Sequence, residues 1–338
     1  MSDSDLDMNA LQSLRSQFAQ ALTDFASSPS STFKVLRSVQ STSPPSSSPI
    51  RTLYVLDSSF NPPSKAHLAL VKNALRTTTF LSSSSRSETA SRPPPPPQPS
   101  PPSQANPAES RVLFLLATVN ADKTPEPAAF PDRLVMMTLM AEELRSALSD
   151  PPVVDIGITK KPYFVDKAAS IDDSGAYATA SPRDPGDHFE QIHLTGFDTL
   201  IRIFTAKYYP DHTPPLSALA PFLTRHRVRA TVRVDKDSPS KNVKDTTGAD
   251  EDLSSIDGQL AYLKRIADGD MESDGLKREW ASRVDLVVDE TGETQGVSST
   301  RIRNAAKEGR WSDVNALVGR GVGDWIREDG LYTTTTNK

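Results

Sequence analysis

The chain has 338 residues, a formal net charge of -5 and no cysteine. The length suits one large α/β domain or two small ones, and without cysteine there is no disulfide, no thiolate metal ligand and no cysteine nucleophile. The acidic balance, with an isoelectric point near 5.6, gives no general attraction to nucleic acid or to an anionic membrane, and we expect neither as a partner.

Hydrophobic residues make up 36% of the chain, and its 28 prolines are clustered, so we expect a folded core that carries long polar insertions. The N-terminus is acidic where a signal or transit peptide would be basic. No stretch approaches the ~18 apolar residues that suggest a membrane-spanning helix. These features predict a cytoplasmic or nuclear protein.

The first part of the chain, residues 1–49, is predicted to form a helix followed by a linker. Apolar side chains recur with a helical period over residues 8–25, and the segment from Ser41 to Pro49 is rich in serine and proline. We predict that one folded domain occupies residues 50–333 and that residues 334–338 form a tail.

Within that domain, short apolar runs alternate with helical patterns. In chain order we predict a strand at 53–56, a helix at 66–75, a strand at 112–116, a helix at 131–148, strands at 153–156 and 191–194, a helix at 197–204, strands at 228–234 and 284–288, and helices at 300–308, 311–318 and 322–328. Because strands alternate with helices, we predict a parallel sheet with helices on both faces.

Three polar segments interrupt this pattern. Residues 77–110 are rich first in serine and then in proline, and residues 237–255 are polar. Neither can bury enough apolar surface to offset its ordering entropy, so both are predicted to be disordered insertions. Residues 172–188, polar with glycine and proline, are predicted to form a loop. The Pro/Ser-rich segments could also contact protein partners.

A first polar motif, Asp57-Ser58-Ser59-Phe60-Asn61-Pro62-Pro63-Ser64-Lys65-Ala66-His67, joins the first buried strand of the domain to the next helix. In an open parallel sheet, ligands bind just beyond the carboxyl ends of the strands, and a helix N-terminus suits a phosphate. Ser64 would be the N-cap, and His67, about one turn in, would donate to phosphate oxygens. A capped helix with an incidental histidine would show the same spacing, so both interpretations stay open.

A second motif, Gly296-Val297-Ser298-Ser299-Thr300-Arg301-Ile302-Arg303, follows the last predicted strand. Ser299 or Thr300 would cap a helix, with Arg303 on its first turn beside the exposed amides. Hydroxyls, amides and a guanidinium at one helix start make a second phosphate-binding cradle. Taken alone, the motif is weak evidence, since such residues before a helix are ordinary caps.

Together the two motifs resemble those of the nicotinamide mononucleotide adenylyltransferases, a family of the nucleotidylyltransferase superfamily. The shared pattern is a strand followed by S-F-N-P-x-x-x-x-H, with [IV]-S-S-T-x-x-R near the end of the chain. Three further segments are similar to family segments: Leu116 to Lys123, Leu194 to Leu200 and Trp325 to Tyr332. The resemblance therefore spans roughly residues 50–333 apart from the insertions, and it is strongest to a divergent fungal branch.

The resemblance implies a Rossmann-like α/β fold and adenylyl transfer from ATP to nicotinamide mononucleotide or nicotinate mononucleotide, with NAD or its analogue and pyrophosphate as products. It implies His67 and Arg303 as catalytic residues that meet charge on the phosphates, Mg²⁺ carried by the ATP phosphates, and no metal held by the protein alone. Lys123 and Arg133 would bind the mononucleotide. The implied ATP-binding residues are Ser59, Phe60, Asn61, Ser64, His67, Gly196, Asp198 (on the adenosine), Ser298, Ser299, Thr300 and Arg303.

The sequence departs from the family pattern at several positions. Ser58 and Ala66 stand where the family has glycine, Ser64 replaces a threonine or histidine, and the segment from Lys160 to Tyr163 lacks the expected tryptophan. Two alternatives stay open as a result: a protein of the same fold that binds or hydrolyses ATP without transferase activity, and an interaction protein that acts through its Pro/Ser segments.

The remaining arginines and histidines are predicted to have structural rather than ligand-binding roles. The arginines between Arg225 and Arg233 surround one predicted strand, and we predict a solvated strand face for them rather than phosphate contacts. The histidines lack metal-ligand spacing, and His193 is predicted to be a strand residue.

Overall fold

The computed structural model of the chain describes residues 7–40, 49–76, 80–81, 109–119, 128–178, 189–232, 253, 255–289, 292–293 and 296–333. Within these residues, one sheet of eight strands has the order β1-β5-β4-β2-β6-β7-β8-β3. The parallel strands are β2 (Thr52–Asp57), β4 (Ser110–Ala117), β5 (Val153–Thr159), β6 (Glu190–Gly196), β7 (Arg227–Val232) and β8 (Val284–Val288). Two antiparallel strands, β1 (Phe33–Val39) and β3 (Phe80–Leu81), form the edges.

The order of the parallel strands determines where a ligand can bind. Numbered in chain order from β2, they lie across the sheet as 3-2-1-4-5-6, the order of a dinucleotide-binding α/β sheet. The direction of the connections reverses between β2 and β6, and the crevice beyond the carboxyl ends of two such strands is the usual ligand site. The predicted α/β class, with a mostly parallel sheet and a Rossmann-like order, is confirmed.

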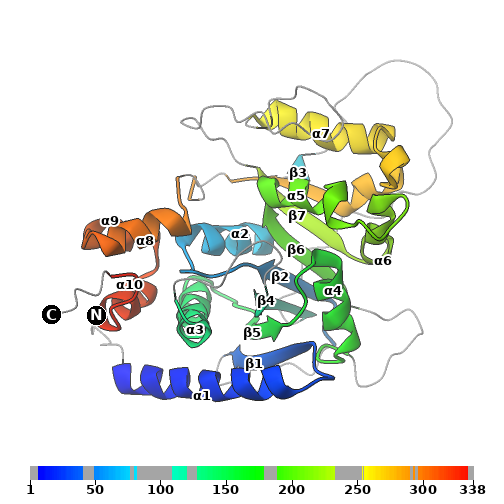
Figure 1. Cartoon of the computed structure of the whole chain (residues 1–338). Helices are drawn as coiled ribbons and strands as arrows, with labels where there is room; N and C mark the ends of the chain where they lie inside the picture. The colour runs from blue at the N-terminus through cyan, green and yellow to red at the C-terminus, as the bar shows by residue number, and fades with distance from the viewer. Residues whose placement is uncertain are drawn as a thin grey trace.

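One face of the sheet carries the larger core. Its helices are α1 (Met8–Ser27), α2 (Lys65–Leu75), α3 (Phe130–Ser146), α8 (Ser299–Lys307), α9 (Trp311–Leu317) and α10 (Arg320–Glu328). Tyr54 and Leu56 of β2 point into this core, because alternate residues of a strand face opposite sides. In Figure 1, α8, α9 and α10 form a group beyond α2 and α3.

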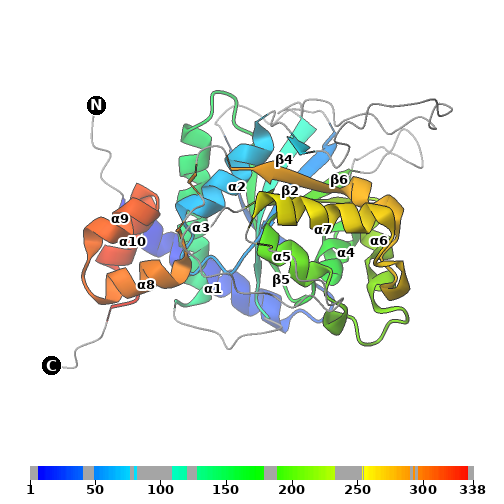
Figure 2. The same cartoon turned by 90° about the horizontal axis from the view of Figure 1, so that it is seen from above.

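The opposite face is covered by α4 (Phe164–Asp173), α5 (Phe197–Ile203), α6 (Ala220–Leu223) and α7 (Ile256–Asp268). Leu53 and Val55 of β2 pack here against Ile171 of α4. Figure 2 shows these helices on the side of the sheet away from α8 to α10. Since both faces are covered, the middle strands are apolar without alternation, as their sequence pattern predicts.

The N-terminal segment is part of this fold and not a separate helix and linker. The predicted helix is present as α1, which packs on α3, but residues 33–39 form the unpredicted strand β1, paired antiparallel with β5. The predicted domain start at residue 50 is therefore wrong, because α1 and β1 share the sheet and core of the domain. Residues 41–48 of the predicted linker lie outside the described residues.

The predicted insertions are described only at their ends. Phe80 and Leu81 pair with β8, Ser110 already belongs to β4, and Ser255 is the N-cap of the unpredicted helix α7. Glu109 and Leu253 are also described, and the other residues of both segments lie outside the described residues. The predicted loop at 172–188 contains the end of α4 and the buried Tyr177, whose hydroxyl donates to Asp155 at 3.1 Å.

The arginines of β7 do not form a solvated face. Arg229 is buried, lies 3.3 Å from Asp285 of β8 and donates to the Ala74 carbonyl at 3.0 Å. Arg227 pairs with Glu190 and Asp285. The prediction failed because the acidic partners come from neighbouring strands that a local pattern does not reveal. His193 is a buried strand residue, as predicted. No helix in the described part of the chain is both long and apolar enough to cross a membrane.

Candidate active site

The first motif forms the loop between β2 and α2, next to the point where the strand order reverses. Phe60 has a φ of +45°, and its fully buried ring lies 5.9 Å from Phe114 and 5.3 Å from His67, between ring centroids. The Phe60 side chain is therefore the floor of the loop and does not face a ligand. Ser59 is exposed at the same turn, so a ligand would meet the backbone and hydroxyl groups here.

His67 lies in the first turn of α2 and is held through both ring nitrogens. The Ser64 backbone N–H donates to Nδ1 at 3.0 Å, and Ser64 Oγ lies 2.9 Å from the same nitrogen. An N–H donor requires a lone pair on Nδ1, so the ring proton is on Nε2. Nε2 lies 2.9 Å from Ser58 Oγ and donates to it. His67 is thus set as a neutral hydrogen-bond donor, and Ser64 is the predicted N-cap.

The second motif begins α8 and contacts the first motif directly. Its N-cap is Ser298, which accepts from the Arg301 N–H at 3.2 Å. The prediction that Ser299 or Thr300 caps this helix is wrong, because Ser299 is already its first helical residue. The Ser299 hydroxyl instead donates to the Pro62 carbonyl at 3.0 Å.

Arg303 joins the two motifs through its guanidinium. Nη1 donates to the Asn61 carbonyl at 2.8 Å, and Nη2 donates to Thr300 Oγ1 at 3.1 Å. Arg133 of α3 reaches the same loop, where its Nη1 lies 3.5 Å from the Ser59 carbonyl. The carbonyls of Ser59, Asn61 and Pro62 are thus each bonded by a side chain from another element. Residues predicted from two distant motifs and from α3 meet at one loop.

Positive charge gathers beside this loop. Burial lowers the pKa of Arg133; the neighbouring Tyr332 phenol raises it, and the nearby Arg303 guanidinium lowers it further. Two guanidinium groups that repel each other, together with the N-termini of α2 and α8, make a site that suits an anion. Lys123, the other residue predicted to bind the mononucleotide, lies outside the described residues.

Gly196 and Asp198 lie on the neighbouring strand's end. Gly196 ends β6 and is the N-cap of α5, and Asp198 is exposed in the first turn of that helix. Because β6 pairs in parallel with β2, these residues are at the same edge of the sheet as the first motif. They lie on the far side of the switch point from β4.

Two polar contacts at the site were not predicted from the sequence. Asp57, at the end of β2, forms an ion pair with Lys167 of α4, 2.6 Å between Oδ2 and Nζ. The Tyr332 hydroxyl donates to Asn61 Oδ1 at 2.8 Å. Asp57 is the first residue of the first motif and Tyr332 is the last residue of the C-terminal segment that resembles the family. The sequence does not show that Asp57 pairs with Lys167 or that Tyr332 bonds to Asn61, because these contacts depend on the fold.

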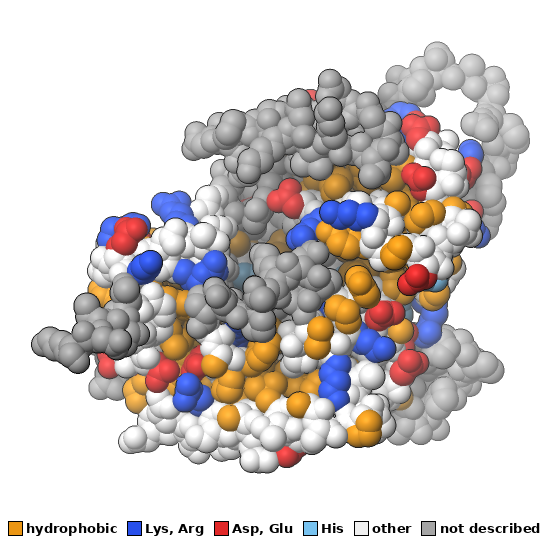
Figure 3. All heavy atoms as spheres, in the orientation of Figure 1, with side chains coloured by type: hydrophobic (Ala, Val, Ile, Leu, Met, Phe, Trp, Pro, Cys, Tyr) orange, Lys and Arg blue, Asp and Glu red, His pale blue; other side chains and the backbone are white. Residues whose placement is uncertain are grey.

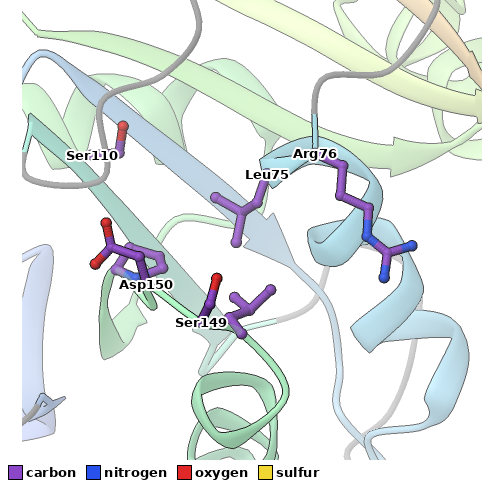
Figure 4. A pocket seen from close by; sticks show the side chains of 7 residues that line it. Leu75, Arg76, Ser110, Ser149 and Asp150 are labelled. Carbon is purple, nitrogen blue, oxygen red and sulfur yellow. The ribbon is translucent and has the colours of Figure 1, made fainter.

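A cavity of about 220 Å³ lies elsewhere in the molecule. Its lining includes Leu75, Arg76, Ser110 and Asp150, which Figure 4 shows around the end of α2 and the start of β4. Ser110 is the first residue of β4, so the cavity is at the amino end of the sheet, opposite the two motifs. It is not part of the candidate active site.

Two helix starts and two arginines lie at the switch point of this sheet, an arrangement that suits the phosphates of a nucleotide. The protein is 30% identical to a protein of Schizosaccharomyces pombe over 259 residues, which are 77% of this chain and 77% of the relative. The relative is named "Putative nicotinamide mononucleotide adenylyltransferase". The chain belongs to the nicotinamide mononucleotide adenylyltransferase family, as its motifs suggested.

Two solved structures also match, both of the Plasmodium falciparum nicotinic acid mononucleotide adenylyltransferase, one complexed with NaAD and one with APC. The identities are 11% and 12%, the TM-scores are 0.42 and 0.44, and each match covers 83% of this chain and 97% of the other. The fold assignment does not depend on these scores; it rests on the strand order and on the fungal relative. No family model matches the chain.

Proposed function

We propose that the protein transfers the adenylyl group of ATP to nicotinamide mononucleotide or nicotinate mononucleotide. A phosphate oxygen of the mononucleotide attacks the α-phosphorus of ATP, the bond from that phosphorus to the bridging oxygen breaks, and pyrophosphate leaves with the bonding electrons. The dinucleotide NAD, or its nicotinate analogue, is the other product. The observation that carries the proposal is the joining of the two motifs by Arg303 beside His67, in a chain of this family.

Each residue of the cradle has a role that fits its contacts. His67 donates from Nε2, and Arg303 supplies positive charge, to the phosphate oxygens on which negative charge develops. The hydroxyls of Ser298 and Thr300 and the amides at the start of α8 would bind the remaining oxygens, while the Ser299 hydroxyl stays on the Pro62 carbonyl. Catalysis would consist mainly of positioning and charge stabilisation, with no covalent intermediate on the protein.

The donors of the cradle suit phosphate oxygens and not a cation. Within the described residues, no three acidic, histidine or cysteine side chains are grouped so as to hold a metal ion. Mg²⁺ would be held by the ATP phosphates and water, as is usual for this ion. When bound, it would neutralise part of the phosphate charge. Lys123 and Arg133 would bind the mononucleotide, with Arg133 already beside Ser59.

A second candidate function is ATP binding or hydrolysis without adenylyl transfer. The observation that favours it is the contact of Ser58 Oγ with His67 Nε2 at 2.9 Å. Ser58 stands where the family has glycine, and its hydroxyl accepts the hydrogen bond from His67 Nε2 that a phosphate oxygen would otherwise accept. ATP would have to displace this contact or bind beside it.

A product assay separates the two functions. The protein is incubated with ATP, Mg²⁺ and, in separate reactions, nicotinamide mononucleotide, nicotinate mononucleotide and a purine mononucleotide. A dinucleotide and an equal amount of pyrophosphate from either pyridine substrate would support the proposal. ADP and phosphate alone would favour the second candidate, and no ATP binding or turnover would contradict both.

Asp198 should contribute to ATP binding. If its carboxylate accepts from the adenosine, as the family resemblance implies, Asp198→Ala should weaken ATP binding about tenfold, the effect of losing one hydrogen bond to a charged group. Asp211→Ala is the matched control, because Asp211 is also exposed but lies in a turn after Tyr209. Equal dissociation constants for the two variants, measured by calorimetry, would remove the adenosine role.

A further inference from the structure

The strained backbone of the described chain is concentrated at one contact. Among the described residues, the non-glycine residues with a positive φ are Phe60, at +45°, and Tyr332, at +65°. Such backbone conformations are unfavourable for residues with a side chain and persist where the surroundings fix them, most often at functional sites. These two lie far apart in the sequence, yet one hydrogen bond, from the Tyr332 hydroxyl to Asn61 Oδ1 at 2.8 Å, links Tyr332 to the residue after Phe60.

The end of α10 aims Tyr332 back at the first motif. Gly330 adopts a φ of +61° just past the helix, its N–H donates to the Arg327 carbonyl at 3.3 Å, and the Leu331 N–H donates to the Ile326 carbonyl at 2.9 Å. This pair of bonds is a Schellman motif, which ends a helix and reverses the chain. Backbone hydrogen bonds therefore define this turn, and the turn fixes the position of the Tyr332 backbone.

The N-terminal helix supports the same turn. Gln12 of α1 donates to the Asp329 side chain at 2.9 Å, and Arg15 of α1 pairs with the buried Asp132, next to Arg133, 2.5 Å between Nε and Oδ1. Figure 1 shows the start of α1 below α10, with α3 beside both. The start of α1 is thus bonded to the end of α10 and to α3, next to Arg133.

The Tyr332 hydroxyl is a donor at this position. Burial raises the pKa of the phenol, and this effect outweighs the opposing effect of the nearby Arg133 and Arg303 guanidinium groups. The phenol therefore stays protonated and donates to Asn61 Oδ1. That bond sets the orientation of the Asn61 amide, because its oxygen faces Tyr332 and its nitrogen faces the other way. Arg303 holds the backbone carbonyl of the same residue at 2.8 Å.

We propose that Tyr332 is a positioning residue of the ATP site, which holds the Phe60-Asn61-Pro62 turn in its strained, ligand-ready form through the Asn61 amide. The proposal rests on the proposed function, since it assigns ATP to this turn. It gives the C-terminal segment a role in nucleotide affinity and not only in packing.

The test uses the full chain and Tyr332→Phe, which removes the hydroxyl and keeps the ring. Tyr208→Phe is the control, because Tyr208 packs on the opposite face of the sheet. Two quantities are measured for each: amide hydrogen exchange of peptides covering residues 58–64 in the ligand-free protein, and the dissociation constant for ATP. A lost hydrogen bond of ~1 kcal/mol corresponds to about fivefold.

We expect Tyr332→Phe alone to exchange faster at residues 58–64 and to bind ATP about fivefold more weakly, with a melting temperature lower by no more than roughly 2–4 °C. Unchanged exchange in Tyr332→Phe would overturn the positioning role whatever its ATP affinity. Faster exchange with unchanged ATP affinity would also overturn it, because the turn would then not matter to the nucleotide. If the wild-type protein binds no ATP but Tyr332→Phe still exchanges faster at residues 58–64, the proposed function is contradicted. The role of Tyr332 in holding the turn would then still be supported.

Discussion

Arg303→Ala should lower the rate of adenylyl transfer by about 10²-fold or more. A preorganised donor that meets charge in the transition state typically contributes about 3 kcal/mol, and Arg303 is the guanidinium that joins both motifs. Its loss also removes the bond to the Asn61 carbonyl, so part of the effect would come from the turn. The side chain is half-buried at the edge of the sheet, so the variant should fold.

Two further variants separate charge from geometry. Arg301→Ala is the matched control, because Arg301 lies on the same helix, is exposed and donates from its guanidinium to the Gly296 carbonyl at 3.0 Å, within its own motif. Arg303→Lys keeps the charge and loses the planar fork, so it should recover part of the rate. The three variants are compared by kcat and KM with circular dichroism as the check of folding. Equal rates for Arg303→Ala and Arg301→Ala would reduce the second motif to a helix cap.

Local patterns in the sequence were sufficient for the middle of the fold. The apolar run around Val55 and the helical spacing after His67 each extend over about ten residues. Such patterns are reliable because a parallel strand is buried on both faces and its covering helix is buried on one. The strand β1 was missed because its pattern is partly exposed along an edge and its stability comes from pairing with β5, more than a hundred residues later.

The candidate site shows the same division between local and long-range information. Ser64 could be predicted as a cap because its signal is local, and the two motifs could be placed at one sheet edge by the strand–helix rule. Three adjacent hydroxyl residues at 298–300 can each cap a helix, so local sequence does not choose Ser298. The contact of Tyr332 with Asn61 joins residues 271 positions apart, so it depends on the tertiary fold. The contact of Ser58 with His67 is local, but it depends on the conformation of the loop between β2 and α2.

His67→Ala should also lower the rate of adenylyl transfer by about 10²-fold, the typical effect of removing one donor to developing charge. The Ser64 N–H occupies Nδ1, so the ring acts as a neutral donor from Nε2; a proton on Nδ1 would place two N–H groups against each other. The structure therefore favours a donor role over the role of a cation or a nucleophile. The ring is only partly buried, and its loss should leave the fold intact.

This role predicts the behaviour of a second substitution. His67→Gln can supply an amide N–H near the position of Nε2 and should recover part of the lost rate, which a nucleophile or a cation would not allow. His212→Ala is the control, since His212 is an exposed loop residue. Rates are measured with ATP labelled in the adenylyl group, and the protein is examined for bound label after quenching. A stable AMP–protein adduct would contradict direct displacement, and a folded His67→Ala variant with the turnover of His212→Ala would remove His67 from the phosphate cradle.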